Sequence, residues 1–190
     1  ALSSAASDVY KRQVYNADDP VFSGTVSKLV SESDLGEITY GRLAADASKE
    51  NVGDDITLTA FYTENDNYNV TVINGKLVIT PSDENAIVAT GITKTYDGQT
   101  ASIVANAAQP DSTIEYSVDG QSWTAINPVF TNVGTYTVQV RATKPNYESV
   151  SASADVVVNP ATITVTANNQ TKIAGETDPE LTYTLSLIHI

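Results

Sequence analysis

The sequence predicts an all-β protein made of tandem small β domains. Three observations predict this: apolar and polar residues alternate with a period of two, Asn-Gly and Asp-Gly dipeptides separate the alternating segments, and short motifs recur about 80 residues apart. Domains of that size bury a modest core without disulfides, which fits a chain of 190 residues that has no cysteine.

The clearest alternation lies in 136–142 and 150–158. Tyr, Val and Ala occupy every second position there, and mostly polar residues lie between them. A shorter segment, 114–118, has the same pattern. Such segments are typical of antiparallel strands with one buried face and one solvated face.

Two dipeptides predict tight hairpins, because Asn-Gly and Asp-Gly accept the positive φ that such turns require. Asn74-Gly75 is expected to join two strands and to place Val72 opposite Leu77. Asp119-Gly120 is expected to join 114–118 to the strand that carries Trp123. At most one short helix is expected, over 26–35, where apolar residues recur at helical spacing.

Internal repetition defines the domain organisation. The recurring motifs are Asn51-Val52-Gly53 with Asn132-Val133-Gly134, Asn67-Tyr68 with Asn146-Tyr147, and Asp19-Pro20 with Asp178-Pro179. They predict a first repeat over 14–81 that lacks its opening strand, a whole repeat over 82–160, and the start of a third repeat over 161–184. The third repeat is expected to be poorly packed, because its sheet partners are missing.

The two ends share a signature at the level of codons. Residues 8–13, DVYKRQ, are encoded by GAT GTG TAT AAG AGA CAG, and the reverse complement, CTG TCT CTT ATA CAC ATC, encodes LSLIHI, residues 185–190. We therefore interpret 1–13 and 185–190 as tails of translated transposon sequencing adapter, leave them out of the prediction of the fold, and expect them to be extended. We expect 14–184 to be a metagenomic fragment of a longer reading frame.

These motifs resemble a known family. Asp-Pro near the start, NVG before a central strand, NY before the last strands and a closing ITP are similar to the MBG-type repeats of bacterial surface proteins. The middle repeat, with TYDGQ, EYSVDGQSW and NPVFTNVGTYTVQVRA, resembles the bacterial immunoglobulin-like YDG-type repeat. The resemblance implies secreted modules strung between an effector or adhesive domain and a wall or sorting signal.

The middle repeat is therefore expected to be an immunoglobulin-like β-sandwich of about seven strands. Tyr136 follows Gly134 closely, as in the tyrosine corner of such sandwiches, where the hydroxyl bonds back to nearby backbone. An ordinary buried tyrosine is the alternative. The first repeat is expected to be either sandwich-like or a β-grasp.

Composition disfavours several classes of function. A formal net charge of -13 argues against a nucleic-acid partner, because phosphate binds a basic face. The only histidine, His189, lies in a predicted adapter tail, and neither a GxSxG elbow nor a phosphate-binding loop occurs. No apolar run reaches the roughly 20 residues that span a bilayer. We expect no catalytic site and no cofactor.

Two groups of residues are candidates for ligand binding. Glu64, Asp66 and Asn67 offer the oxygen ligands that calcium prefers, although they lack the spacing of an EF-hand loop. Solvated loop charge is the alternative for them. Trp123 and Tyr96 are candidate stacking surfaces for a sugar ring, and an ordinary core position is the alternative for each.

Three functions are compatible with these features. The first is a non-catalytic stalk of adhesion repeats that spaces an effector domain from a bacterial cell, with neighbouring repeats of the same chain as its partners. The second is direct binding of host mucin or polysaccharide. The third is an accessory region of a secreted carbohydrate-active enzyme. All three predict an extracellular location, at the bacterial cell surface or in the cell wall.

Overall fold

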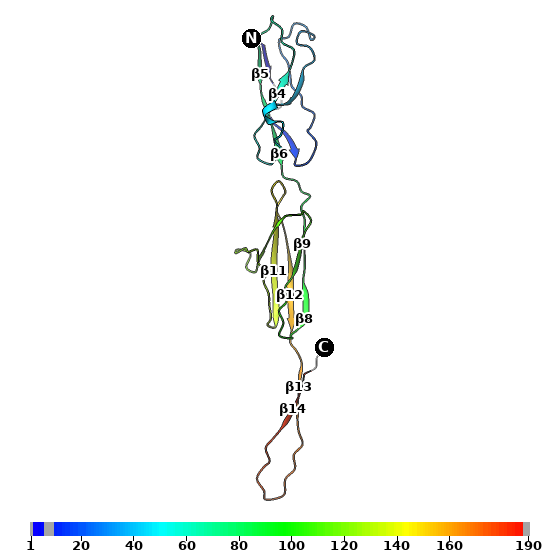
Figure 1. Cartoon of the computed structure of the whole chain (residues 1–190), viewed down its shortest axis with the longest axis vertical. Helices are drawn as coiled ribbons and strands as arrows, with labels where there is room; N and C mark the ends of the chain where they lie inside the picture. Colours follow the sequence, from blue (N-terminus) through cyan, green and yellow to red (C-terminus); the bar gives the residue numbers. More distant parts are fainter. Residues whose placement is uncertain (1, 6–9, 188–190) are drawn as a thin grey trace. The chain divides into compact units, whose positions relative to one another are not determined.

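The computed structural model describes residues 2–5 and 10–187, and nearly all regular elements in this part of the chain are β-strands (Figure 1). The exception is the 3-10 turn η1 (Ala44–Asp46). The predicted all-β class is confirmed. The chain divides into two compact units: Ala1–Ile87 with Ala107–Ile114 and Arg141–Ser151, and Val88–Asn106 with Glu115–Val140 and Ala152–Ile190.

A mixed four-stranded sheet forms the centre of the first unit. Its strands lie in the order β2 (Tyr10–Val14), β6 (Gly75–Thr80), β4 (Ile56–Phe61) and β3 (Thr39–Arg42). β2 is parallel to β6, whereas the other pairs are antiparallel. Its core consists of Ile56, Leu58, Leu77 and Ile79, against which Tyr15, Phe22 and Val52 pack. No helix packs on this sheet among the described residues, so the sandwich-like alternative fits better than the β-grasp.

The predicted hairpin at Asn74-Gly75 is wrong. β5 (Val70–Ile73) pairs with β1 (Leu2–Ala5), whereas β6 pairs with β2 and β4, so β5 and β6 do not pair with each other. Neither residue of the dipeptide has the positive φ of a tight hairpin. Gly75 is instead the first, buried residue of β6 and lies opposite Leu58 in the register with β4.

The short helix expected over 26–35 is also absent. This segment consists of loop and turns, and among its apolar residues only Leu35 is buried, whereas Val30 is 88% exposed. An amphipathic helix would need a continuous apolar stripe against the core. The backbone N–H of Val30 donates instead to the Tyr68 hydroxyl at 3.2 Å, so a tertiary contact takes the place of a helical hydrogen bond.

Part of the amino-terminal tail is extended and pairs with the first sheet. β2 pairs with β6 from Tyr10 opposite Lys76 to Val14 opposite Thr80, and Gln13 is 6% exposed. This edge of β6 has backbone groups that need a partner, and an extended tail supplies it. The adapter origin of these residues remains a prediction, and 1, 6–9 and 188–190 lie outside the described residues.

The middle repeat is an immunoglobulin-like sandwich whose six strands form two sheets. One sheet has the order β10 (Thr113–Ser117), β11 (Gly134–Thr143), β12 (Val150–Asn159) and β8 (Ile92–Thr95), and the other pairs β7 (Ile87–Thr90) with β9 (Val104–Ala107). A seventh strand does not form: 123–131 makes only the isolated bridges of Thr124 with Tyr116 and of Phe130 with Ala101. The bridge at Thr124 confirms that the chain turns back at Asp119-Gly120.

The predicted faces of the two long strands are confirmed. Every second residue of β11 and β12 faces the interior, and the fully buried ones are Val138, Val140, Ala142, Val156 and Val158. The predicted tyrosine corner is also confirmed, since the Tyr136 hydroxyl donates to the carbonyl oxygen of Asn132 at 3.2 Å. Phe130 stacks on the Tyr136 ring with 4.2 Å between the ring centroids.

The third repeat is a single antiparallel hairpin of β13 (Ile163–Ala167) and β14 (Tyr183–Leu187). Its register puts Val165 opposite Leu185 on one face, and both side chains are more than half exposed. From 161 to 186 every residue except Pro179 is exposed. The prediction that this repeat is poorly packed is confirmed, and 185–187, from the predicted carboxy-terminal tail, form part of β14.

Candidate functional site

The predicted calcium residues lie in the loop between β4 and β5. Glu64, Asp66 and Asn67 are all exposed, and the Asn67 amide donates to Oδ1 of Asn65 at 3.0 Å. Nowhere in the described part of the chain do three His, Cys, Asp or Glu side chains come together as metal ligands would. The geometry of this loop follows from hydrogen bonds between its own asparagines.

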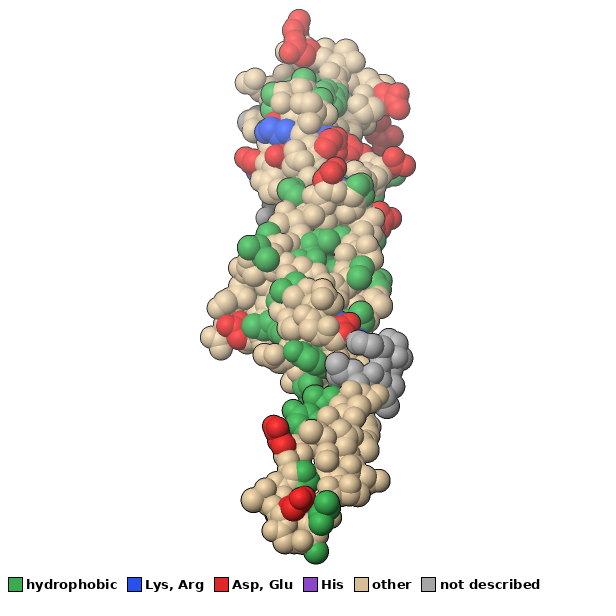
Figure 2. All heavy atoms as spheres, turned by 60° about the horizontal axis from the view of Figure 1, so that its bottom comes forward, with side chains coloured by type: hydrophobic (Ala, Val, Ile, Leu, Met, Phe, Trp, Pro, Cys, Tyr) green, Lys and Arg blue, Asp and Glu red, His purple; other side chains and the backbone are tan. Residues whose placement is uncertain are grey.

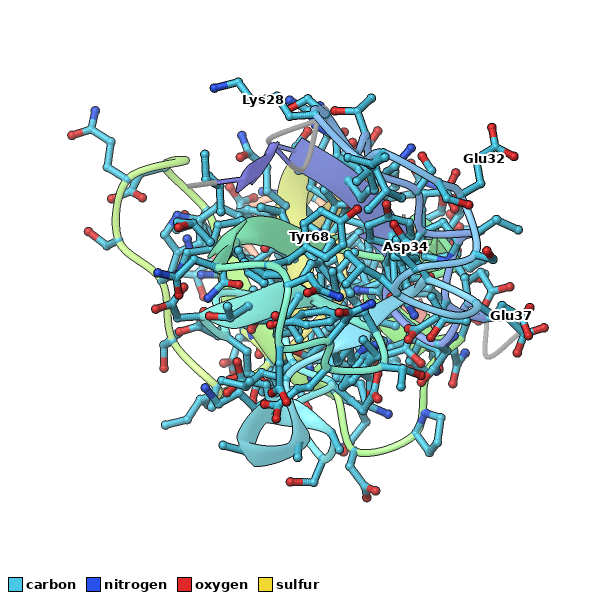
Figure 3. All side chains as sticks on the ribbon, turned by 90° about the horizontal axis from the view of Figure 1, so that it is seen from above. Lys28, Glu32, Asp34, Glu37 and Tyr68 are labelled. Atoms are coloured by element: carbon cyan, nitrogen blue, oxygen red, sulfur yellow. The ribbon has the colours of Figure 1, made fainter. Side chains whose placement is uncertain are left out.

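A neighbouring contact closes the same end of the first repeat. The Tyr68 hydroxyl donates to the Asp34 carboxylate, and this hydrogen bond raises the pKa of Tyr68 above its ordinary value. Figure 3 shows Tyr68 and Asp34 toward the centre of the view, with Lys28, Glu32 and Glu37 projecting outward. The apolar pocket beside this contact holds about 10 Å³, which suits one water molecule rather than a ligand.

The two candidate sugar-stacking residues lie far apart in the sheet. Tyr96 directly follows β8 and is 44% exposed, whereas Trp123 is half-buried beside the bridge that Thr124 makes with β10. β8 and β10 are the opposite edges of the four-stranded sheet. The structure therefore does not bring Tyr96 and Trp123 together in one stacking platform.

An open groove of about 490 Å³ crosses the first repeat, and Arg42 lies in its wall. The Arg42 side chain is only 8% exposed. Its Nε donates to Asp19 at 2.9 Å, and Nη1 donates to Glu50 at 2.8 Å and to the carbonyl oxygen of Lys49 at 2.6 Å. Nη2 donates to Gln13 at 3.2 Å and to the second oxygen of Asp19.

These contacts occupy all five N–H donors of the guanidinium. Burial lowers the pKa of Arg42, but the hydrogen bonds that Arg42 donates to Asp19 and Glu50 outweigh it and hold the pKa above its ordinary value. No N–H is left for an anionic ligand. Arg42 therefore joins three segments of the first repeat rather than serving as a binding residue. Phe22 and Tyr40 supply the aromatic lining of the groove.

The densest set of side-chain contacts between distant segments involves the turn 144–148, which connects β11 to β12 and belongs to the first compact unit. Asn146 accepts a hydrogen bond at Oδ1 from the N–H of Val52 at 2.8 Å. Its Nδ2 donates to Oδ1 of Asn51 at 2.8 Å. The motif Asn51-Val52-Gly53 of the first repeat thus meets the motif Asn146-Tyr147 of the second.

Tyr147 makes a second contact beside the first. Its ring packs edge to face on Tyr15, with 5.4 Å between the centroids and 72° between the ring planes. Its hydroxyl accepts a hydrogen bond from Nδ2 of Asn16 at 3.3 Å. Lys144 places its ammonium group 5.3 Å from the centre of the same ring. The recurrence of both motifs in the sequence was the signal for this site, but nothing in a local pattern pairs one motif with the other.

The sequence model of one family matches two separate parts of the chain. This family is described as MBG domain (YGX type), and it matches residues 5–78 and 163–188. The predicted resemblance to MBG-type repeats is confirmed. The resemblance of the middle repeat to the YDG type remains a prediction. No curated protein matches the sequence significantly.

Among solved structures, similar chains are cadherin fragments. Drosophila N-cadherin EC1-3 is 12% identical with a TM-score of 0.32, and the match covers 84% of this chain and 67% of that one. Human mucin-like protocadherin EC1-2 is 11% identical with a TM-score of 0.34, covering 83% and 98%. Human protocadherin-24 EC1-2 is 13% identical with a TM-score of 0.34, covering 84% and 99%. Within the described residues, no helix has the length and apolar character to cross a membrane.

Proposed function

Because this chain belongs to the family of MBG domains of the YGX type, which are extracellular adhesion-type repeats, we propose that it is part of a non-catalytic stalk. In this function the repeats 14–81, 82–160 and 161–184 belong to a longer array in a large bacterial protein. The array spaces an effector domain from the cell surface or cell wall. Its partners are the neighbouring repeats of the same chain.

One observation carries this proposal. The two segments that match the same family flank, within one chain, a β-sandwich that the match does not include. Tandem domains that alternate in this way contribute length rather than a single active centre.

Charge supports the same function. The chain carries a formal net charge of -13, and acidic side chains outnumber Lys and Arg on the face in Figure 2. Like charge on successive repeats keeps an array soluble and favours separation of the repeats over collapse.

The experiment that tests the stalk is recovery of the full reading frame from the source DNA on both sides of 14–184. We expect many similar repeats that end in a wall-sorting motif or a membrane anchor. A catalytic domain with only these few repeats beside it would contradict the stalk and would make the chain an accessory region of a secreted enzyme.

Direct binding of mucin or polysaccharide is a second candidate, favoured by the open groove with Phe22 and Tyr40 in its wall. Tyr40 lies so close to Gly24 that a Cβ there would be 2.3 Å from its ring. Binding of the whole chain to immobilised mucin and to a panel of polysaccharides tests this function. Binding that Tyr40→Ala abolishes would support it, and no binding to any of them would reject it.

A further inference from the structure

We propose that the turn 144–148 is a connector by which the second repeat binds the motif Asn51-Val52-Gly53 of the first. The inference rests on the proposed array, and it names the surface by which one repeat recognises the repeat before it. The contacts all lie within the first compact unit, to which 144–148 belongs.

The backbone conformation of Asn146 makes the connector possible. Its φ is 69°, in the left-handed region that asparagine tolerates better than most residues. In this conformation its carbonyl oxygen accepts a hydrogen bond from the N–H of Ser82 at 3.0 Å. Its side-chain amide remains free to accept from Val52 and to donate to Asn51. One residue thereby bonds both the first repeat and the segment that joins the two repeats.

The joining segment is held by the same turn. Ser82 accepts at its carbonyl oxygen from the N–H of Glu148 at 2.9 Å, and the Asn85 amide donates to the carbonyl oxygen of Glu148, also at 2.9 Å. Ser82 is 2% exposed and Asn85 is 5% exposed. Flexible linkers are solvated and make few such bonds. This segment therefore lacks the properties of a flexible linker.

The chemistry of the connector is neutral apart from the ammonium group of Lys144. Backbone groups, asparagine amides and two tyrosine rings make the contacts, and Glu148 takes part only through its backbone. Neutral hydrogen bonds and ring packing depend little on ionic strength. We expect the joint to need no metal ion and to tolerate salt, in a chain whose surface is otherwise strongly acidic.

The same motif recurs where another repeat would follow. Asn132-Val133-Gly134 is the counterpart of Asn51-Val52-Gly53 in the second repeat, and its Val133 is 49% exposed, whereas Val52 is half-buried at the joint. The geometry points to the segment around Val133 as the surface that receives the corresponding turn of a complete following repeat.

A distance measurement on the whole chain tests the connector. The chain has no cysteine, so spin labels attach only at Glu32→Cys in the first repeat and Thr113→Cys in the second, both at exposed positions of the first compact unit. In double electron–electron resonance, we expect a narrow distance distribution. Asn146→Gly keeps the left-handed φ accessible but removes the amide, so the distribution should widen toward that of a flexible linker.

A matched control and a second variant complete the test. Asn67→Gly makes the same change at the counterpart motif, away from the joint, and should leave the width unchanged. Asn51→Ala removes the amide on the other side of the contact and should also widen the distance distribution. In the double variant with Asn146→Gly, Asn51→Ala should cause no further widening, because the contact is already lost. Thermal unfolding of each variant identifies any that has lost its fold.

The proposal is overturned if folded Asn146→Gly and Asn51→Ala both keep the parent width, or if EDTA alone widens the distribution. A loose joint would leave the stalk possible as a flexible string of domains. A parent protein without an array would reject the stalk while leaving the joint in place, so the two failures are distinguishable.

Discussion

Gly91 lies against the backbone of Asp155 so closely that a Cβ on Gly91 would be 2.3 Å from the carbonyl oxygen and 3.1 Å from the nitrogen of Asp155. Gly91 is the one residue between β7 and β8, where the chain passes from one sheet of the sandwich to the other. β8 then pairs in parallel with β12, which contains Asp155. Only a residue without a side chain allows the crossing at this distance.

Gly91→Ala should therefore destabilise the sandwich. We expect the free energy of unfolding to fall by about 1–3 kcal/mol, because the methyl group must push backbone rather than a movable side chain. Urea denaturation monitored by Trp123 fluorescence measures it. Thr90→Ala, an exposed neighbour, should change the same free energy by less than about 0.5 kcal/mol. Equal stabilities of the two variants would show that the crossing is looser than the structure indicates.

Arg42→Lys should destabilise the first repeat although it preserves the charge. A lysine ammonium cannot reproduce the planar fork that bonds Asp19, Glu50 and Gln13 together, so these acceptors, among them the buried Gln13, lose a partner. We expect a loss of about 1–3 kcal/mol in the free energy of unfolding, measured by urea denaturation. The control variant is Lys76→Arg, because Lys76 forms an exposed ion pair with Asp55. This substitution should not measurably change the free energy of unfolding. If Arg42→Lys left the free energy of unfolding unchanged, this would contradict the structural role of the Arg42 side chain.

Asp119 should make the sandwich sensitive to acid. Hydrogen bonds from the backbone N–H groups of Ser122 at 2.7 Å and Gln121 at 2.8 Å, and from the Ser117 hydroxyl at 2.9 Å, hold the pKa of Asp119 well below its ordinary range. Because the folded pKa lies below the unfolded value of about 3.9, the stabilisation is complete above that pH and is lost as the pH falls below it.

Asp119→Asn tests this dependence, since the amide oxygen still accepts hydrogen bonds in the turn but does not titrate. Between pH 7 and pH 2, the free energy of unfolding should fall less steeply below about pH 4 in the variant than in the parent chain. If the free energy of unfolding fell equally steeply with pH in both proteins, other carboxylates would be responsible for the loss of stability in acid.

Deleting 1–13 distinguishes a tail that stands outside the fold from one that completes it. Removal of β2 leaves the edge of β6 unpaired and exposes the surface that the buried Gln13 covers. The first repeat should therefore unfold at a lower temperature. Differential scanning calorimetry measures the shift. Deleting 188–190 is the matched truncation at the other end and should not move the transition. An unchanged transition after removal of 1–13 would mean that the pairing of β2 contributes nothing to stability.

The sequence predicted those parts of the fold that depend on local chemistry. The faces of β11 and β12 follow from strict alternation, and the bond from Tyr136 to Asn132 spans only four residues. Asn74-Gly75 predicted a hairpin that does not form, because β6 pairs with β2 and β4 rather than with β5. The helix predicted over 26–35 does not form. The spacing of apolar residues could not show that Val30 has no core to pack against.

The contact between the turn 144–148 and the motif Asn51-Val52-Gly53 could not be predicted from local chemistry. Both motifs of the connector were visible as repeats, but Asn51 and Asn146 are far apart in sequence and neither carries the charge or reactivity that marks a site. The candidates chosen by chemical type, Glu64, Asp66 and Trp123, lie where the structure shows no convergence of ligands. Contacts between neutral polar groups leave no compositional signal and have to be found in three dimensions.

The parallel pairing of β2 with β6 and of β8 with β12 has a mechanical consequence. In each repeat a strand near the beginning of the domain lies beside the strand that closes it and points the same way. In the proposed array, tension would slide these two strands past each other and load all hydrogen bonds between them at once. Antiparallel strands in the same place would separate one bond at a time. The proposed stalk would therefore resist extension through shear between these paired strands.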